Sequence, residues 1–208
     1  VFTLAADHGI TEAGVSAYPS DVTTQMVYNF LRGGSAINVF AEHIGAKVVV
    51  ADLGVKNKIM ISLSKGIRNC EYRDLKISYG TNNFARGPAM SREQAVKSIE
   101  AGITLVEEEI RNGLDLAVPG DMGIGNTTPS AALLATYLKL PVKQLVGPGT
   151  GLDSKGVAHK IKVLETAIRV NKKDCKTPLK TLAALGGLEI AGICGLCLGA
   201  ASKRLAVV

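Results

Sequence analysis

The chain has 208 residues, a net charge of +6 and an apolar fraction of 47%. No apolar run approaches the roughly 18–20 residues of a membrane-spanning helix and no signal-peptide pattern stands at the start, so we expect a soluble cytoplasmic protein with no membrane partner. The cations are dispersed, and aromatic residues make up only 4% of the chain. This pattern argues against a nucleic-acid partner and fits small anionic substrates better.

Short apolar runs alternate with longer helical patterns along the chain. In chain order they predict a strand over Val1–Ala6, a helix over Val22–His43 and a strand over Ala46–Leu53, then a less regular segment over Asn57–Arg86 that forms a peripheral strand or an excursion. A helix over Ser91–Asn112, a strand over Leu114–Val118 and a helix over Thr128–Lys139 follow. The last predicted elements are a weaker strand over Val142–Val146, helices over Val157–Asn171 and Leu188–Lys203, and a weaker strand over Leu205–Val208. Ser91 and Gln94 stand at capping-box spacing. The alternation predicts an α/β fold, with a mostly parallel sheet and helices on both faces.

The two ends of the chain bear on its domain organisation. The sequence opens without methionine on the strand pattern that begins at Val1, and it closes on another strand pattern at Val208. Ligands of open α/β sheets bind beyond the carboxyl ends of the strands. We therefore expect one α/β core over residues 1–208 that is incomplete at both ends.

Cys194 and Cys197 form a C-x-x-C pair within an apolar, small-residue run. That spacing occurs in redox pairs and in half-sites for metals, but no second Cys/His pair stands nearby. Free cysteine in such surroundings behaves as a small buried hydrophobe. We therefore expect two core cysteines in a packed helix, with redox or metal chemistry as the alternative.

The glycine-rich segment from Pro119 to Pro129 follows a predicted strand and leads into a predicted helix. Thr127 or Thr128 is the expected N-cap, with Pro129 at the first helical position. Glycines let the main chain approach a ligand closely, and the helix start favours an anion. Asp121 stands at the mouth of this turn, either as a simple turn cap or as a functional carboxylate.

A second glycine-rich turn runs from Val146 to Leu152 and is followed by Lys160. Its main-chain N–H groups, the Thr150 hydroxyl and the Lys160 ammonium are suited to a phosphate. The spacing matches neither the P-loop nor the dinucleotide fingerprint. A single lysine on a helix is more often solvated than bound to a ligand, so both interpretations of Lys160 stay open.

Polar and apolar groups also follow the first strand. Asp7 and His8 at its end either satisfy buried main-chain groups or bind, orient and catalyse. Tyr18, Pro19 and Met26 are suited to an apolar wall against a flat ring.

These segments stand in the order seen in nicotinate-nucleotide–dimethylbenzimidazole phosphoribosyltransferases, which the chain resembles over essentially its whole length. The resemblance rests on long collinear motifs: Asp7-His-Gly, Gly14-Val-Ser with Tyr18-Pro19 and Val22-Thr23, Gly87-Pro-Ala-Met-Ser91, Gly120 to Pro129, Val146 to Asp153 with Lys160, and Leu185-Gly-Gly-Leu-Glu-Ile190. It implies a homodimeric, Rossmann-like α/β/α enzyme of cobalamin lower-ligand assembly. That enzyme moves phosphoribosyl from nicotinate mononucleotide to dimethylbenzimidazole, without a metal or other cofactor.

The resemblance also implies roles for individual residues. It puts Gly149, Thr150 and Lys160 near the phosphate, and Asn126 and Thr127 near the donor. It makes Asp121 the candidate catalytic carboxylate of this chain. The implied aromatic-base pocket consists of Tyr18, Met26, Met122, Gly123 and Ile124.

Two departures from the family pattern limit these implications. The family's general base resembles a glutamate in a Ser-Ala-Glu segment beyond the point at which this chain ends, and the family often has glutamate where this chain has Asp121. The alternatives are therefore an inert nucleotide-binding fragment, or a relative that uses a different aromatic base. A general NAD-binding module is disfavoured because no G-x-G-x-x-G follows the first strand.

Overall fold

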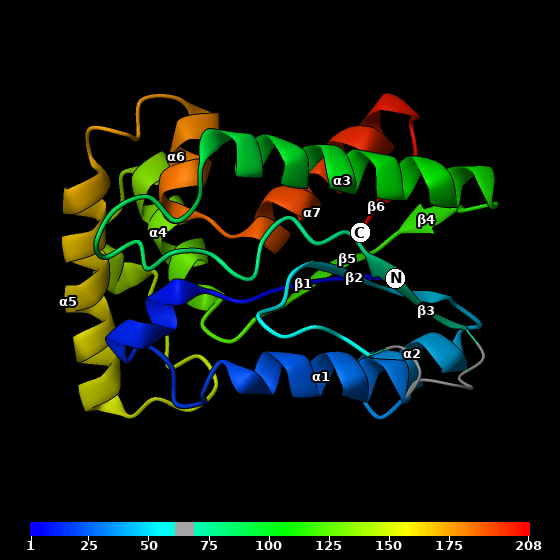
Figure 1. Cartoon of the computed structure of the whole chain (residues 1–208), viewed down its shortest axis with the longest axis horizontal. Helices are drawn as coiled ribbons and strands as arrows, with labels where there is room; N and C mark the ends of the chain where they lie inside the picture. Colours follow the sequence, from blue (N-terminus) through cyan, green and yellow to red (C-terminus); the bar gives the residue numbers. More distant parts are fainter. Residues whose placement is uncertain (61–68) are drawn as a thin grey trace.

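The structure is a computed structural model that describes residues 1–60 and 69–208 (Figure 1). Its strands are β1 (Phe2–Ala6), β2 (Val48–Gly54), β3 (Cys70–Asp74), β4 (Leu116–Ala117), β5 (Pro119–Met122) and β6 (Ala206–Val207). Its helices are α1 (Asp21–Leu31), α2 (Ala36–His43), α3 (Arg92–Arg111), α4 (Thr127–Leu138), α5 (Ser154–Asn171), α6 (Pro178–Leu185) and α7 (Leu188–Ser202), with short 3-10 helices over Gly9–Ala13 and Val142–Gln144. None of the helices in the described ranges is long and apolar enough to span a bilayer.

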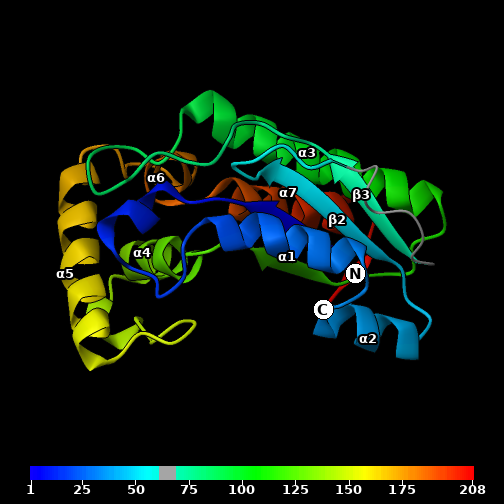
Figure 2. The same ribbon diagram turned by 60° about the horizontal axis from the view of Figure 1, so that its bottom comes forward.

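The main sheet has the strand order β3-β2-β1-β5, and all neighbouring strands are parallel. β1 is buried along its whole length, as its run of apolar residues predicts. Helices α3 and α7 cover one face of the sheet and α1 and α2 cover the other, as both views show (Figures 1 and 2). The predicted α/β fold with helices on both faces is confirmed.

The predicted helix over Val22–His43 is two helices, α1 and α2. The break falls at Gly33-Gly34-Ser35, where Gly33 has a φ of 76°. Ser35 then begins α2 and exchanges capping-box contacts with Asn38. A left-handed glycine followed by a capping serine therefore ends one helix and starts the next.

The strand beside β1 is shifted toward the C-terminus of its predicted position. Phe2 pairs with Pro119 and Leu4 pairs with Asp121, so β5 includes residues that we expected in a turn. Within the predicted strand over Leu114–Val118, only β4 is extended, and it pairs with β6 in a separate two-stranded sheet. The weaker strand prediction at Leu205–Val208 is confirmed by β6.

Other differences lie outside the central sheet. The strand predicted over Val142–Val146 is wrong: Val142–Gln144 form a 3-10 helix after Pro141, and the Val142 side chain packs into an apolar cluster away from the strands. Helix α6 was not predicted, although Thr177 followed by Pro178 is a helix-start signal. The less regular segment contains the peripheral strand β3, and its residues 61–68 lie outside the described residues.

Helices α3 and α7 are in close contact because glycines line their interface. A Cβ atom on Gly195 would overlap the carbonyl of Ile99, and one on Gly102 would overlap the carbonyl of Gly192. The helix predicted around Cys194 and Cys197 is confirmed, but the prediction that both are core residues is wrong: Cys194 is exposed and Cys197 is half-buried. Gly195 faces α3, whereas the neighbouring Cys194 is exposed on the outer side of α7.

The close contact between these helices makes Gly195→Ala destabilising. We expect a loss of about 1–3 kcal/mol in the free energy of unfolding, because the new methyl group meets main-chain atoms that cannot move aside. Urea unfolding followed by circular dichroism measures this loss. The matched control is Gly147→Ala, whose Cβ would have no heavy atom within 4 Å. Equal stabilities for the two variants would contradict the prediction.

Candidate functional site

The carboxyl ends of β1, β2 and β5 lie at one edge of the sheet, toward the part of the molecule that contains α4, α5 and α6 (Figure 1). β1 has β2 on one side and β5 on the other, so the strand order reverses next to β1. In open α/β sheets this reversal opens a crevice beyond the strand ends, where ligands bind. The edge that follows β1 and β5 is therefore the first place to look for a site.

A cavity of about 340 Å³ lies beyond the end of β5, within the size range of small-molecule sites. Two glycine-rich segments, one residue of α5 and the loop after β1 surround it. The lining residues are Val15, Ser16, Met122, Gly123, Ile124, Gly125, Asn126, Thr127, Pro148, Gly149, Thr150 and Lys160. The structure thus brings eight of the predicted site residues around one space, and Val15, Ser16, Gly125 and Pro148 join them.

Lys160 supplies the positive charge of this cavity. Its side chain comes from α5 and is only 2% exposed, so the interpretation as a solvated lysine is wrong. The ammonium donates a hydrogen bond to Thr127 Oγ1 at 2.7 Å and makes no ion pair with any of the described residues. Burial lowers the pKa of Lys160 below its usual range. A buried cation without a carboxylate partner favours the binding of an anion.

The start of α4 and the second glycine-rich turn face this ammonium. Asn126 is the N-cap of α4, so the expected N-cap at Thr127 or Thr128 is wrong by one or two positions. Gly149 has a φ of 58°, and a Cβ there would lie 3.8 Å from Lys160 Nζ. The Lys160 ammonium, the Thr127 hydroxyl and the glycine turn therefore lie together in an arrangement that suits an anion.

Asp121 lies next to this cavity rather than in its lining. It belongs to β5 and its side chain is exposed. The Asn126 amide, which does line the cavity, donates a short hydrogen bond to Asp121 Oδ2. Asn126 therefore connects the carboxylate to the cavity and orients it toward that side.

The predicted aromatic-base residues are divided between three places. Met122, Gly123 and Ile124 line the cavity, where the N–H of Ile124 donates to the buried Thr23 hydroxyl at 3.0 Å. Tyr18 lines a neighbouring cavity of about 340 Å³, together with residues of the loops after β1 and β2. Met26 lies on α1 and packs against the apolar cluster between α1 and the sheet. The structure does not bring Tyr18 and Met26 into the cavity that contains Lys160.

A family model described as Phosphoribosyltransferase (DBI_PRT) matches residues 1–208. The chain belongs to this family. It is 51% identical over 208 residues to the nicotinate-nucleotide–dimethylbenzimidazole phosphoribosyltransferase of Geobacter sulfurreducens, and the match covers 100% of this chain and 57% of that protein. The protein of the same name from Desulforamulus reducens is 49% identical over 205 residues, which cover 99% of this chain and 56% of the relative.

Solved structures agree with this assignment. The crystal structure of CobT from Thermus thermophilus matches with a TM-score of 0.89 and 40% identity, over 99% of this chain and 60% of that one. A second structure from the same organism, a nicotinate-nucleotide–dimethylbenzimidazole phosphoribosyltransferase, matches with a TM-score of 0.86 and 39% identity, over 99% of this chain and 58% of that one. The chain therefore spans a little more than half the length of the relatives that it matches.

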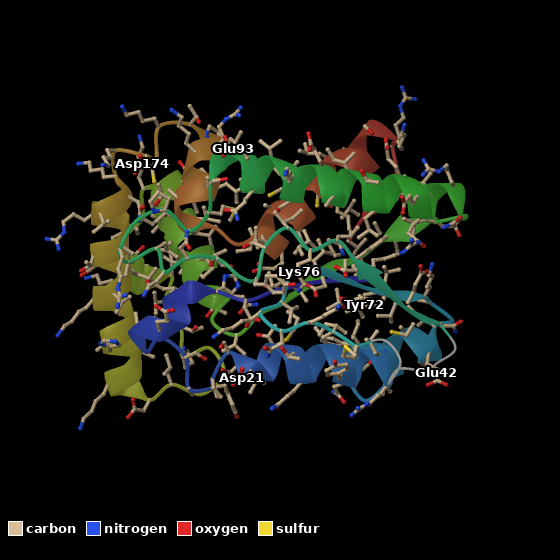
Figure 3. The ribbon with its side chains drawn as sticks, viewed as in Figure 1. Asp21, Glu42, Tyr72, Lys76, Glu93 and Asp174 are labelled. Carbon is tan, nitrogen blue, oxygen red and sulfur yellow. The ribbon has the colours of Figure 1, made fainter. Side chains whose placement is uncertain are left out.

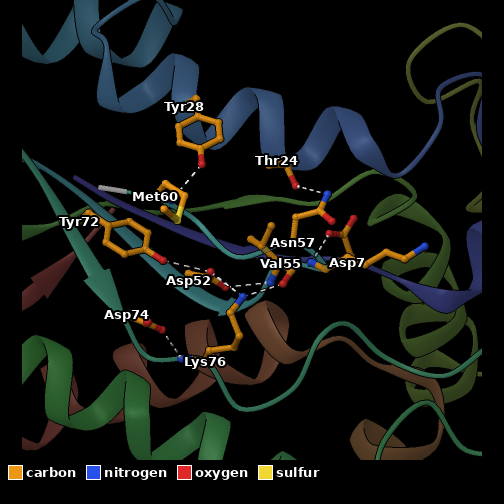
Figure 4. Close-up of polar contacts among 11 residues, drawn as sticks. Asp7, Thr24, Tyr28, Asp52, Val55, Asn57, Met60, Tyr72, Asp74 and Lys76 are labelled. Atoms are coloured by element: carbon orange, nitrogen blue, oxygen red, sulfur yellow. Dashed lines mark hydrogen bonds and ion pairs between the residues drawn. The ribbon is translucent and has the colours of Figure 1, made fainter. Parts of the chain in front are cut away.

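In this member of the family, hydrogen bonds hold the loop after β2 in place at the strand ends (Figure 4). The N–H of Val55 donates to Asp52 Oδ1 at 2.8 Å, and the N–H of Lys56 donates to Asp7 Oδ2 at 2.7 Å. Burial raises the pKa of Asp7, although the hydrogen bond from Lys56 opposes this effect. Two contacts with α1 complete the attachment, Asn57 with Thr24 and Met60 with Tyr28. Asp7 thus accepts a hydrogen bond from one main-chain N–H, that of Lys56, through one of its two carboxylate oxygens.

A larger cavity lies elsewhere in the described part of the chain, between the start of α3 and the connection from α5 to α6. It has a volume of about 700 Å³ and is lined by Arg92, Lys173, Asp174, Lys176 and Lys180 among others. Figure 3 labels Asp174, one of the residues that line it. It lies away from the strand ends and its cations are on the surface. We therefore place the candidate site at the smaller cavity, which has the buried lysine and the helix start.

Proposed function

We propose that this chain carries the donor-binding core of an enzyme that transfers phosphoribosyl from nicotinate mononucleotide to dimethylbenzimidazole. The products are α-ribazole 5'-phosphate and nicotinate. The observation that carries the proposal is the buried Lys160 beside Thr127 and Gly149, in a cavity that the apolar Met122 and Ile124 also line. A mononucleotide has matching chemistry, because it joins one phosphate to one flat ring. The names of the relatives agree with this substrate pair.

The proposed reaction needs no metal. The bond between the anomeric carbon and the pyridinium nitrogen breaks, and its electron pair returns to the ring, so nicotinate leaves without a proton. The incoming benzimidazole nitrogen forms the new bond to the anomeric carbon, and the N–H proton of that ring must pass to a base. A carboxylate close to the sugar can accept that proton or stabilise the positive charge that develops on the ribose.

Asp121 is the carboxylate of this chain that we assign to such a role. The Asn126 amide donates to it from the cavity wall, and β5 holds it at the strand end. The Thr150 hydroxyl, the Gly149 main chain and the Lys160 ammonium bind the phosphate in this proposal. Met122, Gly123 and Ile124 contact the flat ring, with Tyr18 and Met26 as outer members of the base pocket.

Turnover tests the proposal directly. The chain is incubated with nicotinate mononucleotide and dimethylbenzimidazole, and nicotinate release is followed by chromatography. We expect release that depends on the base, and a fall of about 100-fold or more in Asp121→Asn, because the neutral amide neither accepts the proton nor stabilises a cation. Asp115→Asn is the matched control, since Asp115 is an exposed aspartate directly before β4, outside the strand that contains Asp121.

Each other outcome has a defined meaning. Binding of nicotinate mononucleotide without release would contradict transfer by this chain and favour a nucleotide-binding core. Release with another aromatic base, but not with dimethylbenzimidazole, would contradict the proposed acceptor and retain the transferase class. Unchanged release in Asp121→Asn would remove Asp121 from the reaction.

We also propose that the protein works in the cytoplasm as a homodimer and folds as one α/β unit over residues 1–208. Large apolar side chains are exposed on several helices, among them Phe40 on α2, Leu134, Tyr137 and Leu138 on α4, and Leu198 on α7. Exposed apolar groups of this kind favour burial against another surface. Sedimentation analysis gives the oligomeric state, and a monomer at micromolar concentration would contradict the dimer.

A further inference from the structure

Two sequence motifs with no role in the proposed transfer meet as a buried ion pair. His8 follows β1, Glu189 lies in the first turn of α7, and His8 Nε2 is 2.8 Å from Glu189 Oε1. Both side chains are 0% exposed. The carboxylate also lies at the positive end of α7, which stabilises its charge. A fully buried pair of this kind is strongly destabilising to break, because the remaining charge has no solvent.

The imidazole of His8 is enclosed by two glycines from distant parts of the chain. A Cβ on Gly187 would lie 2.6 Å from His8 Cε1, and a Cβ on Gly123 would lie 2.9 Å from His8 Nε2. Gly123 also contacts the Ala6 carbonyl so closely that a Cβ would overlap it. The main chain of Gly123 therefore rests on the His8 ring, and the ring supports the cavity wall at that point.

Beside this support, the wall is attached by the pairing of Met122 with Ala5 in the sheet and by hydrogen bonds of its turn. The N–H of Ile124 donates to Thr23 Oγ1 at 3.0 Å, and the Gly123 carbonyl accepts the N–H of Asn126 at 3.0 Å. The second of these bonds lies within the turn itself and does not tie the turn to the sheet. A rotation of the imidazole would therefore move Gly123, and with it the neighbouring side chains that line the cavity.

We propose that the His8–Glu189 pair is a positioning element of the site. It holds the main chain of Gly123 in the position that the binding of the aromatic ring and the ribose requires. This inference rests on the proposed transferase function. The pair acts through Gly123 and touches no reacting atom. Its contribution is to hold the ground-state geometry, and a displacement of about 1 Å in such a wall can reduce turnover by about 100-fold.

The charge of the pair gives the proposal a pH signature. Burial alone lowers the pKa of His8, but Glu189 and two further carboxylates together outweigh burial, and the net pKa is raised. The other charged groups that face the ring are Asp7 on the β1 side and Asp121 on β5, and both also favour the imidazolium. A histidine with a raised folded pKa stabilises the fold below its ordinary pKa and loses that contribution as the pH rises through the folded value. We therefore expect kcat to fall on the alkaline side as His8 loses its proton.

The test compares Glu189→Gln with Glu109→Gln in the same chain. Glu109 is the matched control, since it is a buried glutamate of α3 that pairs with Lys47 and Arg73 at the opposite end of the sheet. We expect Glu189→Gln to lower kcat by about 10- to 100-fold, and to shift the alkaline limb of the kcat profile to lower pH, because the unpaired histidine loses its proton earlier. Glu109→Gln is expected to change stability without changing kcat or the profile.

Hydrogen exchange of the free protein separates this inference from the proposed function. If the wild type shows no turnover, the transferase proposal fails. The positioning role is still supported if the main-chain amides of residues 123–125 exchange faster in Glu189→Gln than in the wild type and in Glu109→Gln. If Glu189→Gln does not fold, the double variant His8→Gln/Glu189→Gln replaces the ion pair with neutral amides and is measured in its place. The inference would be overturned if a folded variant had the same kcat, the same pH profile and the same exchange rates as the wild type.

Discussion

Replacing Lys160 with methionine is expected to weaken the binding of nicotinate mononucleotide by about 10- to 100-fold, the contribution of one or two hydrogen bonds from a charged donor. The ammonium is buried beside Thr127 and Gly149, and none of the described residues neutralises it with an ion pair. Methionine retains most of the unbranched stem and removes the ammonium group, with its charge and its hydrogen bonds. Isothermal titration calorimetry gives the affinity, and a thermal melt checks that the fold is retained.

Lys162→Met is the control, since it removes an exposed lysine from the same helix. The pH dependence gives a second readout. Because burial lowers the pKa of Lys160, the affinity of the wild type is expected to fall at a lower pH than an ordinary lysine would give. Lys160→Met should show no such fall. Equal affinities in the two variants would exclude Lys160 from the phosphate site.

The second large effect is expected for Gly123→Ala, which should reduce kcat/KM by about 100-fold or more. The new methyl group would overlap the Ala6 carbonyl and press on the His8 ring, so the turn between β5 and α4 has to move. Steady-state kinetics measure the loss. Because β1 is buried at the centre of the sheet, we expect the main chain of the turn at Gly123 to shift and β1 to keep its position.

Gly120→Ala is the matched control for this variant. Gly120 lies three residues earlier on β5, and a Cβ there would meet only the Phe2 carbonyl at 3.7 Å, an ordinary contact. We expect turnover close to that of the wild type. If Gly120→Ala and Gly123→Ala lose activity equally, the loss comes from the strand, and the specific contact at Gly123 has no part in it.

The sequence pattern alone predicted the layered α/β arrangement and most of the helices. β1 and β2 read as continuous apolar runs because both faces of a central parallel strand are buried. The start of α3 was also predictable, since Ser91 and Gln94 exchange the contacts of a capping box. These features depend on local sequence, and periodicity and capping residues report them directly.

The strand boundaries near the site were not predictable in this way. Pro119, Gly120 and Asp121 have the composition of a turn, yet they pair with β1 because its backbone groups need a partner at that edge. The residues Val142–Gln144 have a strand-like pattern, yet they form a 3-10 helix whose Val142 side chain packs into an apolar cluster away from the sheet. In each case packing against distant segments overrode the local preference.

The residue types of the site were visible in the sequence, and the family resemblance assigned them their roles. Only the tertiary structure decided which of them share one space: Lys160 is buried beside Thr127, while Tyr18 and Met26 lie outside that cavity. It also brought His8 to Glu189, which are 181 residues apart in the chain and lie 2.8 Å apart in space. The sequence determines which groups are available and how each segment prefers to fold. Contacts across such separations depend on how the sheet and its helices pack, and no local pattern reports them.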